Sequence, residues 1–335
     1  MKLKVGFTYD SKSEYLKLDP DSGDKYAEFD TDDTLSDIET ALKTSGNEII
    51  KIGNVKNLIK RINNGERWDI VFNICEGLKG RNRESQVPVI LELYDIPYVG
   101  SDGLTLGITL DKVIAKKIVG YHGIKTAKFV DIKSIQELEN NINKIKSLLP
   151  VILKPSCEGT SKGVSEKSLC YNIDEVKKYV LELLNKYSQP ILVEQFIKGY
   201  EFTVAIIGNT PPEVLPPVQI LINGKEDLGD DFYTYQRIGS KQIKYVCSDN
   251  IDSVLKNKII KLSLDSYIIL GCRDFGRIDL RVDYNLEPYF LECNPLPNLG
   301  RDEIFAVAAK KANISYKNII CNILEAGLKR YNIIK

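Results

Sequence analysis

Three oxygen-bearing side chains near the C-terminal end of the chain have the types and spacing of a ligand set for a hard cation. Asp279 lies within the apolar segment Gly276 to Val282, and Glu292 and Asn294 end the next one, Pro288 to Asn294. Mg²⁺ takes a few carboxylate and amide oxygens and keeps its other positions for water and phosphate oxygens. The set therefore predicts a metal site that works together with a nucleotide phosphate.

Both apolar segments are expected to be neighbouring strands. Alternation places Asp279 on the face opposite its apolar neighbours, and it places Phe290, Glu292 and Asn294 together on one face of the second strand. The alternative is that these acidic residues form the solvated face of a hairpin. Because the flanking residues are strongly apolar, a buried carboxylate here would need a metal ion or Arg277 as its partner.

A loop of small residues follows the apolar segment that ends at Lys154. It reads KPSCEGTSKG, ending at Gly163, and its glycines allow backbone N–H groups to wrap around phosphate oxygens. The loop lacks the G-x-x-x-x-G-K-[ST] pattern, and an ordinary turn is the alternative. Lys154 favours a phosphate site, because an anionic ligand would satisfy a lysine at the end of a buried strand.

A third segment, Ile191 to Val204, reads as strand, turn and strand, with Glu194 ending the first strand and Glu201 opening the second. Such a linker offers backbone groups to an adenine ring and a carboxylate to ribose hydroxyls. Taken alone, an ordinary strand-turn-strand unit with exposed glutamates is the alternative.

Composition limits the classes of protein to which the chain can belong. The 335 residues suggest two or three domains, and 46 Lys and Arg balance 46 Asp and Glu. A net charge of zero argues against a general electrostatic attraction to nucleic acid or to an anionic membrane. The start, MKLKVGFTYD, becomes polar too early for a signal peptide, and no apolar run reaches the roughly 20 residues of a spanning helix. We therefore expect a cytoplasmic protein without nucleic-acid or membrane partners.

Cysteine and histidine usage argues against a disulfide framework, a zinc site and a histidine-based catalytic centre. The seven cysteines are scattered and never spaced as Cys-x-x-Cys, and His122 is the single histidine.

The order of predicted elements gives α/β and α+β architecture in three parts. Strands and helices alternate over residues 1–100, which predicts a doubly wound α/β domain. Residues 101–188 predict a small α+β lobe, with a helix from Ser134 to Leu149 capped by Ser134 and Glu137 as a capping box, and a strand near Gly163 to Ser168. Residues 189–335 predict a second lobe with the metal site. The acidic stretch Asp19 to Asp33 is predicted to be a mobile loop.

In this order the motifs resemble the ATP-grasp superfamily, and within it the D-alanine–D-alanine ligases. The resemblance runs from about Trp68 to Leu328. Its residues are IPYVGS from Ile96, Leu110 to Lys112, Lys154 to Gly163, Val193 to Phe196, Glu201 to Val204, Gly276 to Asp279, and Leu291 to Asn294.

The resemblance implies an ATP-grasp fold in which two α+β lobes clamp ATP. It implies an ATP-dependent carbon–nitrogen ligase that forms ADP and joins small amino acids, D-alanine by default, through an acyl phosphate. Two Mg²⁺ ions would be held by Asp279, Glu292 and Asn294, with Mn²⁺ as an alternative ion, and Arg277 would stabilise the oxyanion. The implied nucleotide-binding residues are Lys112, Lys154, Glu158, Gly159, Thr160, Ser161, Glu194, Gln195, Phe196, Ile197 and Glu201.

The departures from the family pattern concern the amino-acid pockets. Glu14, Glu76 and Asn298 are the candidates for substrate binding, although the family's serine for the second carboxylate is missing from the segment after Pro297. The phosphate-contacting lysine of the mobile loop falls at Arg237 or Lys241.

Two alternatives stay open for the function: an ATP-binding sensor or partner protein without ligase activity, and an ATP-grasp ligase for another amino acid or a peptide acceptor. A homodimer also stays open.

Overall fold

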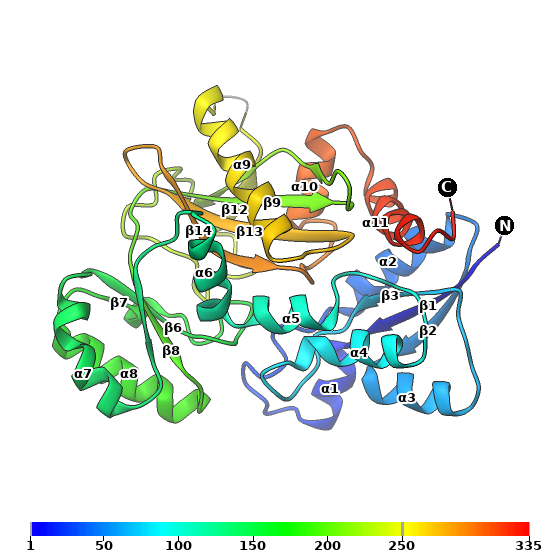
Figure 1. Cartoon of the computed structure of the whole chain (residues 1–335), viewed down its shortest axis with the longest axis horizontal. Coiled ribbons are helices and arrows are strands. Elements are labelled where there is room, and N and C mark those ends of the chain that lie inside the picture. Colours follow the sequence, from blue (N-terminus) through cyan, green and yellow to red (C-terminus); the bar gives the residue numbers. More distant parts are fainter. Residues whose placement is uncertain (1, 249–250, 335) are drawn as a thin grey trace.

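The computed structural model describes residues 2–248 and 251–334, which form three sheets with helices packed against them (Figure 1). No helix in these described residues is long and apolar enough to cross a membrane.

The N-terminal sheet is parallel, with strand order β2-β1-β3-β4. Its strands are β1 (Lys4–Tyr9), β2 (Glu48–Gly53), β3 (Ile70–Ile74) and β4 (Tyr98–Val99). Around them lie α1 (Lys12–Leu18), α2 (Asp32–Lys43), α3 (Val55–Asn63), η1 (Arg83–Ser85) and α4 (Gln86–Leu93). The core on one face includes residues of α2, and the core on the other includes residues of α3 and α4. Burial on both faces explains the nearly continuous apolar run of β3.

The second sheet is antiparallel, with order β5-β8-β6-β7. Its elements are β5 (Phe129–Ile132), α7 (Ile135–Lys146), β6 (Val151–Pro155), η2 (Glu166–Ser168), β7 (Leu169–Cys170), α8 (Ile173–Tyr187) and β8 (Ile191–Gln195). Helices α7 and α8 pack together against this sheet (Figure 1). The domain boundaries stay a prediction, and β8 lies beyond the one predicted at residue 188.

The third sheet has six strands in the order β12-β11-β9-β13-β14, with β10 also paired to β9. Its strands are β9 (Tyr200–Ile207), β10 (Glu213–Val214), β11 (Val218–Ile222), β12 (Ile243–Val246), β13 (Phe275–Val282) and β14 (Pro288–Asn294). One core of this sheet is built with α6 (Lys112–Tyr121) and α9 (Ser253–Ile269). Helix α5 (Gly103–Leu110) precedes α6, and Asp111 caps α6 by accepting from Val113 and Ile114 N–H groups.

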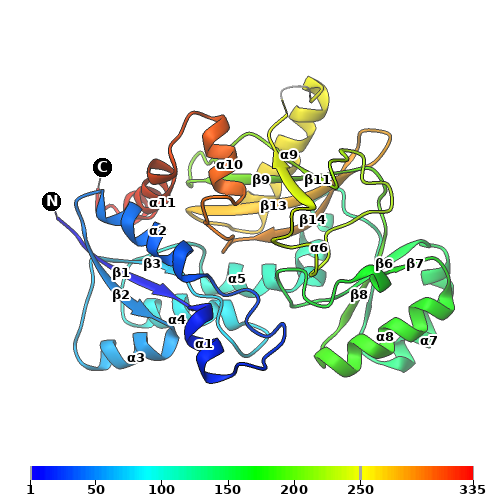
Figure 2. The same cartoon turned by 180° about the vertical axis from the view of Figure 1, so that it is seen from behind.

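The C-terminal helices α10 (Ile304–Lys311) and α11 (Tyr316–Arg330) join the third sheet to the N-terminal one. They share a single core with α2 and the N-terminal strands, and α2, α10 and α11 lie close together in Figure 2. This shared core fixes the position of the N-terminal domain beside β13 and β14.

Two local predictions were wrong. The segment predicted as a strand near Gly163 to Ser168 contains the short 3-10 helix η2. Ser134 caps α7, but the Glu137 carboxylate accepts from Lys133 N–H, so the capping box is not formed. The mobility of the acidic stretch Asp19 to Asp33 stays a prediction, but its aromatic residues Tyr26 and Phe29 are buried.

Candidate functional site

A cavity of about 390 Å³ lies where the three sheets meet. Most of the predicted site residues line it: Glu76, Lys112, Lys154, Glu158, Gly159, Thr160, Ser161, Glu194, Gln195, Phe196, Ile197, Glu201, Arg277, Asp279, Glu292, Asn294 and Asn298. A cavity of this size is typical of small-molecule sites.

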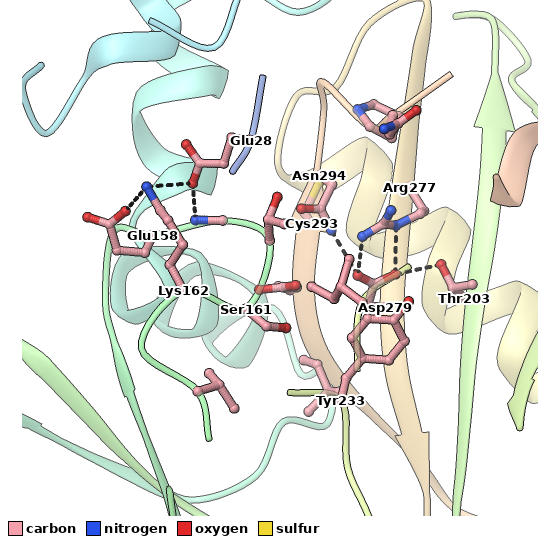
Figure 3. Close-up of a pocket in the computed structure, with 18 of the residues that line it drawn as sticks. Glu28, Glu158, Ser161, Lys162, Thr203, Tyr233, Arg277, Asp279, Cys293 and Asn294 are labelled. Atoms are coloured by element: carbon pink, nitrogen blue, oxygen red, sulfur yellow. Dashed lines mark hydrogen bonds and ion pairs between the residues drawn. The ribbon is translucent and has the colours of Figure 1, made fainter. Parts of the chain in front are cut away.

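The predicted metal-binding side chains lie on neighbouring strands at one wall of the cavity. The register pairs Asp279 with Glu292 and Arg277 with Asn294. The Asp279 carboxylate accepts from Arg277 Nε at 2.9 Å and Nη2 at 2.8 Å, from Asn294 Nδ2 at 2.9 Å, and from Thr203 Oγ1 (Figure 3). A carboxylate with four donors is fixed in position.

The face predicted for Phe290 was wrong. A β-bulge interrupts the pairing between Asp279 and Leu280, so that Leu280 pairs with Phe290 and Asp279 with Glu292. The extra residue turns Phe290 into the core, while Glu292 and Asn294 face the cavity. The bulge therefore separates an apolar half of β14 from a polar half.

Glu292 stays ionised although it lies deep in the cavity. Burial raises its pKa, but the attraction of Lys112 and Lys154 is stronger and lowers the pKa to about 2. Lys112 Nζ lies 3.1 Å from Glu292 Oε2 and also donates to the Glu158 carbonyl. One carboxylate is thus held beside two cations that a phosphate could share.

The donor set fits Mg²⁺ in combination with phosphate. In the part of the chain that the structure describes, no three His, Cys, Asp and Glu side chains are grouped so that they could hold a metal ion by themselves. Asp279 and Glu292 supply two carboxylates and Asn294 a carboxamide, which suits an ion that takes only one or two protein carboxylates and binds phosphate oxygens as well.

Glu194 is a buried anion between two lysines. Its carboxylate lies 2.5 Å from Lys116 Nζ and 2.9 Å from Lys154 Nζ. Burial raises the pKa of Glu194, but the two lysines outweigh it and the net shift is downward. Lys154 therefore has a carboxylate partner in the protein itself, which the sequence did not indicate.

The end of the cavity next to β8 is apolar and aromatic. Phe196 packs with Val164 and Phe232, and the Arg281 guanidinium lies 4.7 Å from the centre of the Phe196 ring. Glu201 lies 3.8 Å from Arg281, and its pKa is raised because burial outweighs that attraction. A flat ring with a polar substituent would fit this end.

The small-residue loop is closed against the N-terminal domain through Glu28. The Glu28 carboxylate accepts from the backbone N–H of Gly159 and lies 3.5 Å from Lys162 Nζ (Figure 3). It also accepts from Arg83 at 2.8 and 2.9 Å. A Cβ at position 159 would lie only 2.7 Å from Glu28 Oε1, so a larger residue there would displace the Glu28 carboxylate. Lys162 also pairs with Glu158 at 2.5 Å.

Three predicted site residues lie outside the cavity lining. Glu14 is exposed on α1, and Lys241 is exposed before β12. Arg237 is held away by Asp231 at 3.1 Å and Glu166 at 3.0 Å. From the same region Tyr233 and Tyr245 do reach the cavity.

Several lining residues were missed from the sequence, chiefly Glu28, Asp30, Glu84 and Glu303. None belongs to a recognisable motif. The buried aromatic residues Tyr26 and Phe29 are the signal that could have indicated the segment of Glu28 and Asp30, because aromatic residues are unusual in a solvated acidic loop.

We expect Glu84→Gln to stabilise the protein more at high pH than at low pH. Burial raises the pKa of Glu84 to about 7, with Arg83 and Lys112 opposing the shift and Glu28 adding to it, while Glu76 is also close. The pKa of a glutamate in the unfolded chain is about 4.3. Between about pH 4.3 and pH 7, Glu84 therefore carries a proton in the folded state and not in the unfolded state, and the free energy of unfolding falls as the pH rises through this range. Glutamine removes this dependence.

The difference in unfolding free energy between Glu84→Gln and the unmodified protein should grow by about 2 to 3 kcal/mol from pH 5 to pH 8.5. Urea unfolding at both pH values measures it. A constant difference would contradict the raised pKa.

The sequence matches a family model described as the D-ala D-ala ligase C-terminus over residues 118–325. A D-alanine–D-alanine ligase of Carboxydothermus hydrogenoformans is 31% identical over 297 residues, covering 86% of this chain and 90% of the relative. An uncharacterized protein of Sinorhizobium fredii is 32% identical over 262 residues, 78% of this chain and 75% of the relative.

The structure resembles the D-alanine–D-alanine ligase of Bacillus anthracis complexed with ATP. The TM-score is 0.74 at 24% sequence identity, with 99% of both chains covered. This likeness confirms the ATP-grasp fold predicted from the motif order.

Proposed function

Because the chain belongs to the D-alanine–D-alanine ligase family of ATP-dependent ligases, we propose that it joins two small amino acids through an acyl-phosphate intermediate. The observation that supports this most directly is the composition of one cavity wall. Asp279, Glu292 and Asn294 face the cavity beside Arg277, Lys112 and Lys154. Such a wall suits a magnesium triphosphate next to a reacting carboxylate.

In the proposed reaction the carboxylate of the first amino acid attacks the γ-phosphorus of ATP, and ADP leaves. The amine of the second amino acid attacks the carbonyl carbon of the acyl phosphate. The amine nitrogen loses a proton, inorganic phosphate leaves, and an amide remains. No bond of the protein is formed or broken in these steps.

The residues of the chain act by binding and by charge. Lys112 and Lys154 would attract phosphate oxygens, and Arg277 would stabilise negative charge on the carbonyl oxygen. Mg²⁺, when bound by Asp279, Glu292 and Asn294, would supply further charge neutralisation at the phosphates. Phe196 and Glu201 would contact the adenosine part of ATP.

The substrates proposed here are D-alanine or another small amino acid. The test measures phosphate release from ATP and Mg²⁺ with a panel of D- and L-amino acids, and mass spectrometry of the product. We expect release that depends on amino acid and a product with the summed mass less one water. Binding of ATP without amino-acid-dependent turnover would refute the ligase and favour the sensor alternative.

A further inference from the structure

The charges that line the cavity do not balance once its ion pairs are formed. Each of five basic lining residues has a carboxylate partner: Lys112 with Glu292, Lys154 with Glu194, Lys162 with Glu158 and Glu28, Arg277 with Asp279, and Arg281 with Glu201. Four lining carboxylates have no hydrogen bond or ion pair among the described residues. We call Asp30, Glu76, Glu84 and Glu303 the acidic wall. Lys12 is the basic lining residue that remains.

Two members of the acidic wall are more than nine-tenths buried. Asp30 is 8% exposed and Glu84 is 7% exposed. A carboxylate withdrawn from water is unfavourable unless a positive group or a donor compensates it. Neither carboxylate has a hydrogen bond or ion pair in the described part of the protein, although Arg83 and Lys112 attract Glu84 without direct contact. Both side chains reach the cavity, where a ligand could supply the donor.

The negative charges of the wall also repel one another. Asp30 is close to Glu303 and to Asp10, and these neighbours add to the burial that raises its pKa to about 7. For Glu76, burial and then Glu84 and Glu28 raise the pKa, with Arg83 opposing them. Repulsion of this kind is relieved by a bound cation.

An organic cation suits the acidic wall better than a metal ion does. The described carboxylates include no group of three or more that could hold a metal ion, so the wall does not form a metal cage. An ammonium or guanidinium group needs only one or two carboxylates and donates several hydrogen bonds to them.

The position of the wall assigns it to an amino-acid substrate, not to the nucleotide. Asp30, Glu76 and Glu84 come from the N-terminal domain, whereas Phe196 at the aromatic end follows β8 of the second sheet. Glu303 immediately precedes α10, and Arg277 is the cation that lowers its pKa against the stronger effect of burial. The wall therefore borders the place where the acyl phosphate would form.

We propose that the amine substrate carries a second positive charge, an ammonium or guanidinium group, which binds between Asp30 and Glu303. The substrate class is a diamino acid or a diamine. This inference rests on the proposed ligase function and narrows it. One unpaired lysine, Lys12, is available for a substrate carboxylate, whereas four carboxylates are available for positive groups.

The first experiment compares acceptors at fixed ATP, Mg²⁺ and D- or L-alanine as donor. Neutral or acidic acceptors are alanine, serine and glutamate, and cationic ones are 2,3-diaminopropionate, ornithine, lysine, arginine and 1,4-diaminobutane. We expect kcat/KM to be at least about 30-fold higher for a cationic acceptor than for a neutral one, which is the size of effect that a buried ion pair contributes to binding. Equal values for neutral and cationic acceptors would overturn the inference while leaving the ligase function standing.

The second experiment uses Asp30→Asn and Glu303→Gln, which keep size and remove charge. Each should lower kcat/KM for the preferred cationic acceptor by at least about 30-fold, and by at least about 10-fold more than it lowers kcat/KM for alanine. Asp33→Asn is the matched control, since Asp33 is exposed on α2 three residues from Asp30. Equal losses for both kinds of acceptor in the variants would overturn the inference.

Calorimetry separates this inference from the proposed function. The unmodified protein, with ADP and Mg²⁺, is titrated with ornithine and with alanine. Tighter binding of ornithine that Asp30→Asn removes would support the cation site even if no amino acid stimulated phosphate release. Equal binding of the two would count against it, whatever the activity.

Discussion

Asp279→Asn should lower the rate of phosphate release by about 10²- to 10³-fold or more at saturating ATP and amino acid. The substitution keeps the shape of the side chain and removes the negative charge that holds Arg277 and that would bind Mg²⁺. Glu292→Gln should have an effect of the same order, because Glu292 is the second carboxylate of the set. Steady-state phosphate release as a function of Mg²⁺ concentration measures both.

Asp265→Asn is the control for these variants. Asp265 forms an exposed ion pair with Lys261 on α9, and exposed pairs contribute little to stability. Circular dichroism establishes whether the variants are folded. Full activity in both Asp279→Asn and Glu292→Gln would mean that the metal set is misassigned.

Arg277→Ala should lower kcat by about 10²- to 10³-fold and leave the KM for ATP within a few-fold. Arg277 faces the cavity beside the metal set, and the neighbouring Asp279 raises its pKa against burial, so its charge is permanent. If it acts on the carbonyl oxygen, its effect belongs to the chemical step and not to nucleotide binding.

Arg277→Lys tests whether charge alone is sufficient, since lysine lacks the planar fork. Arg61→Ala is the control, since Arg61 lies on α3 and forms a partly exposed ion pair with Glu66. Equal losses in kcat and in ATP affinity would count against a role at the oxyanion.

The strand pair β13 and β14 could be predicted from the sequence, because its polar side chains and the alternation of apolar residues around them lie in one short segment. Alternation sufficed to bring Asp279, Glu292 and Asn294 to a single cavity. Alternation did not suffice for Phe290, because one extra residue in a strand moves the side chains on the far side of the bulge to the opposite face of the sheet. Nothing in the local sequence marks where that residue is inserted.

Of the acidic wall only Glu76 was predicted as a substrate-binding residue, because the four members come from three separate parts of the sequence. Asp30 precedes α2, Glu76 follows β3, Glu84 lies in η1 and Glu303 precedes α10. Only the strand order of the N-terminal sheet and its shared core with α10 and α11 bring them together. Arg237 is the opposite case. Its position in the sequence predicts a contact with phosphate, but ion pairs with Asp231 and Glu166 hold its side chain away from the cavity.

The contacts of Glu28 connect the small-residue loop around Gly159 with the N-terminal domain. A nucleotide that lifts the Gly159 loop must break the contacts of Glu28, and Glu28 lies two residues from Asp30 in the same short segment. We therefore expect ATP binding to change the affinity for the amine substrate, and by reciprocity the amine substrate to change the affinity for ATP.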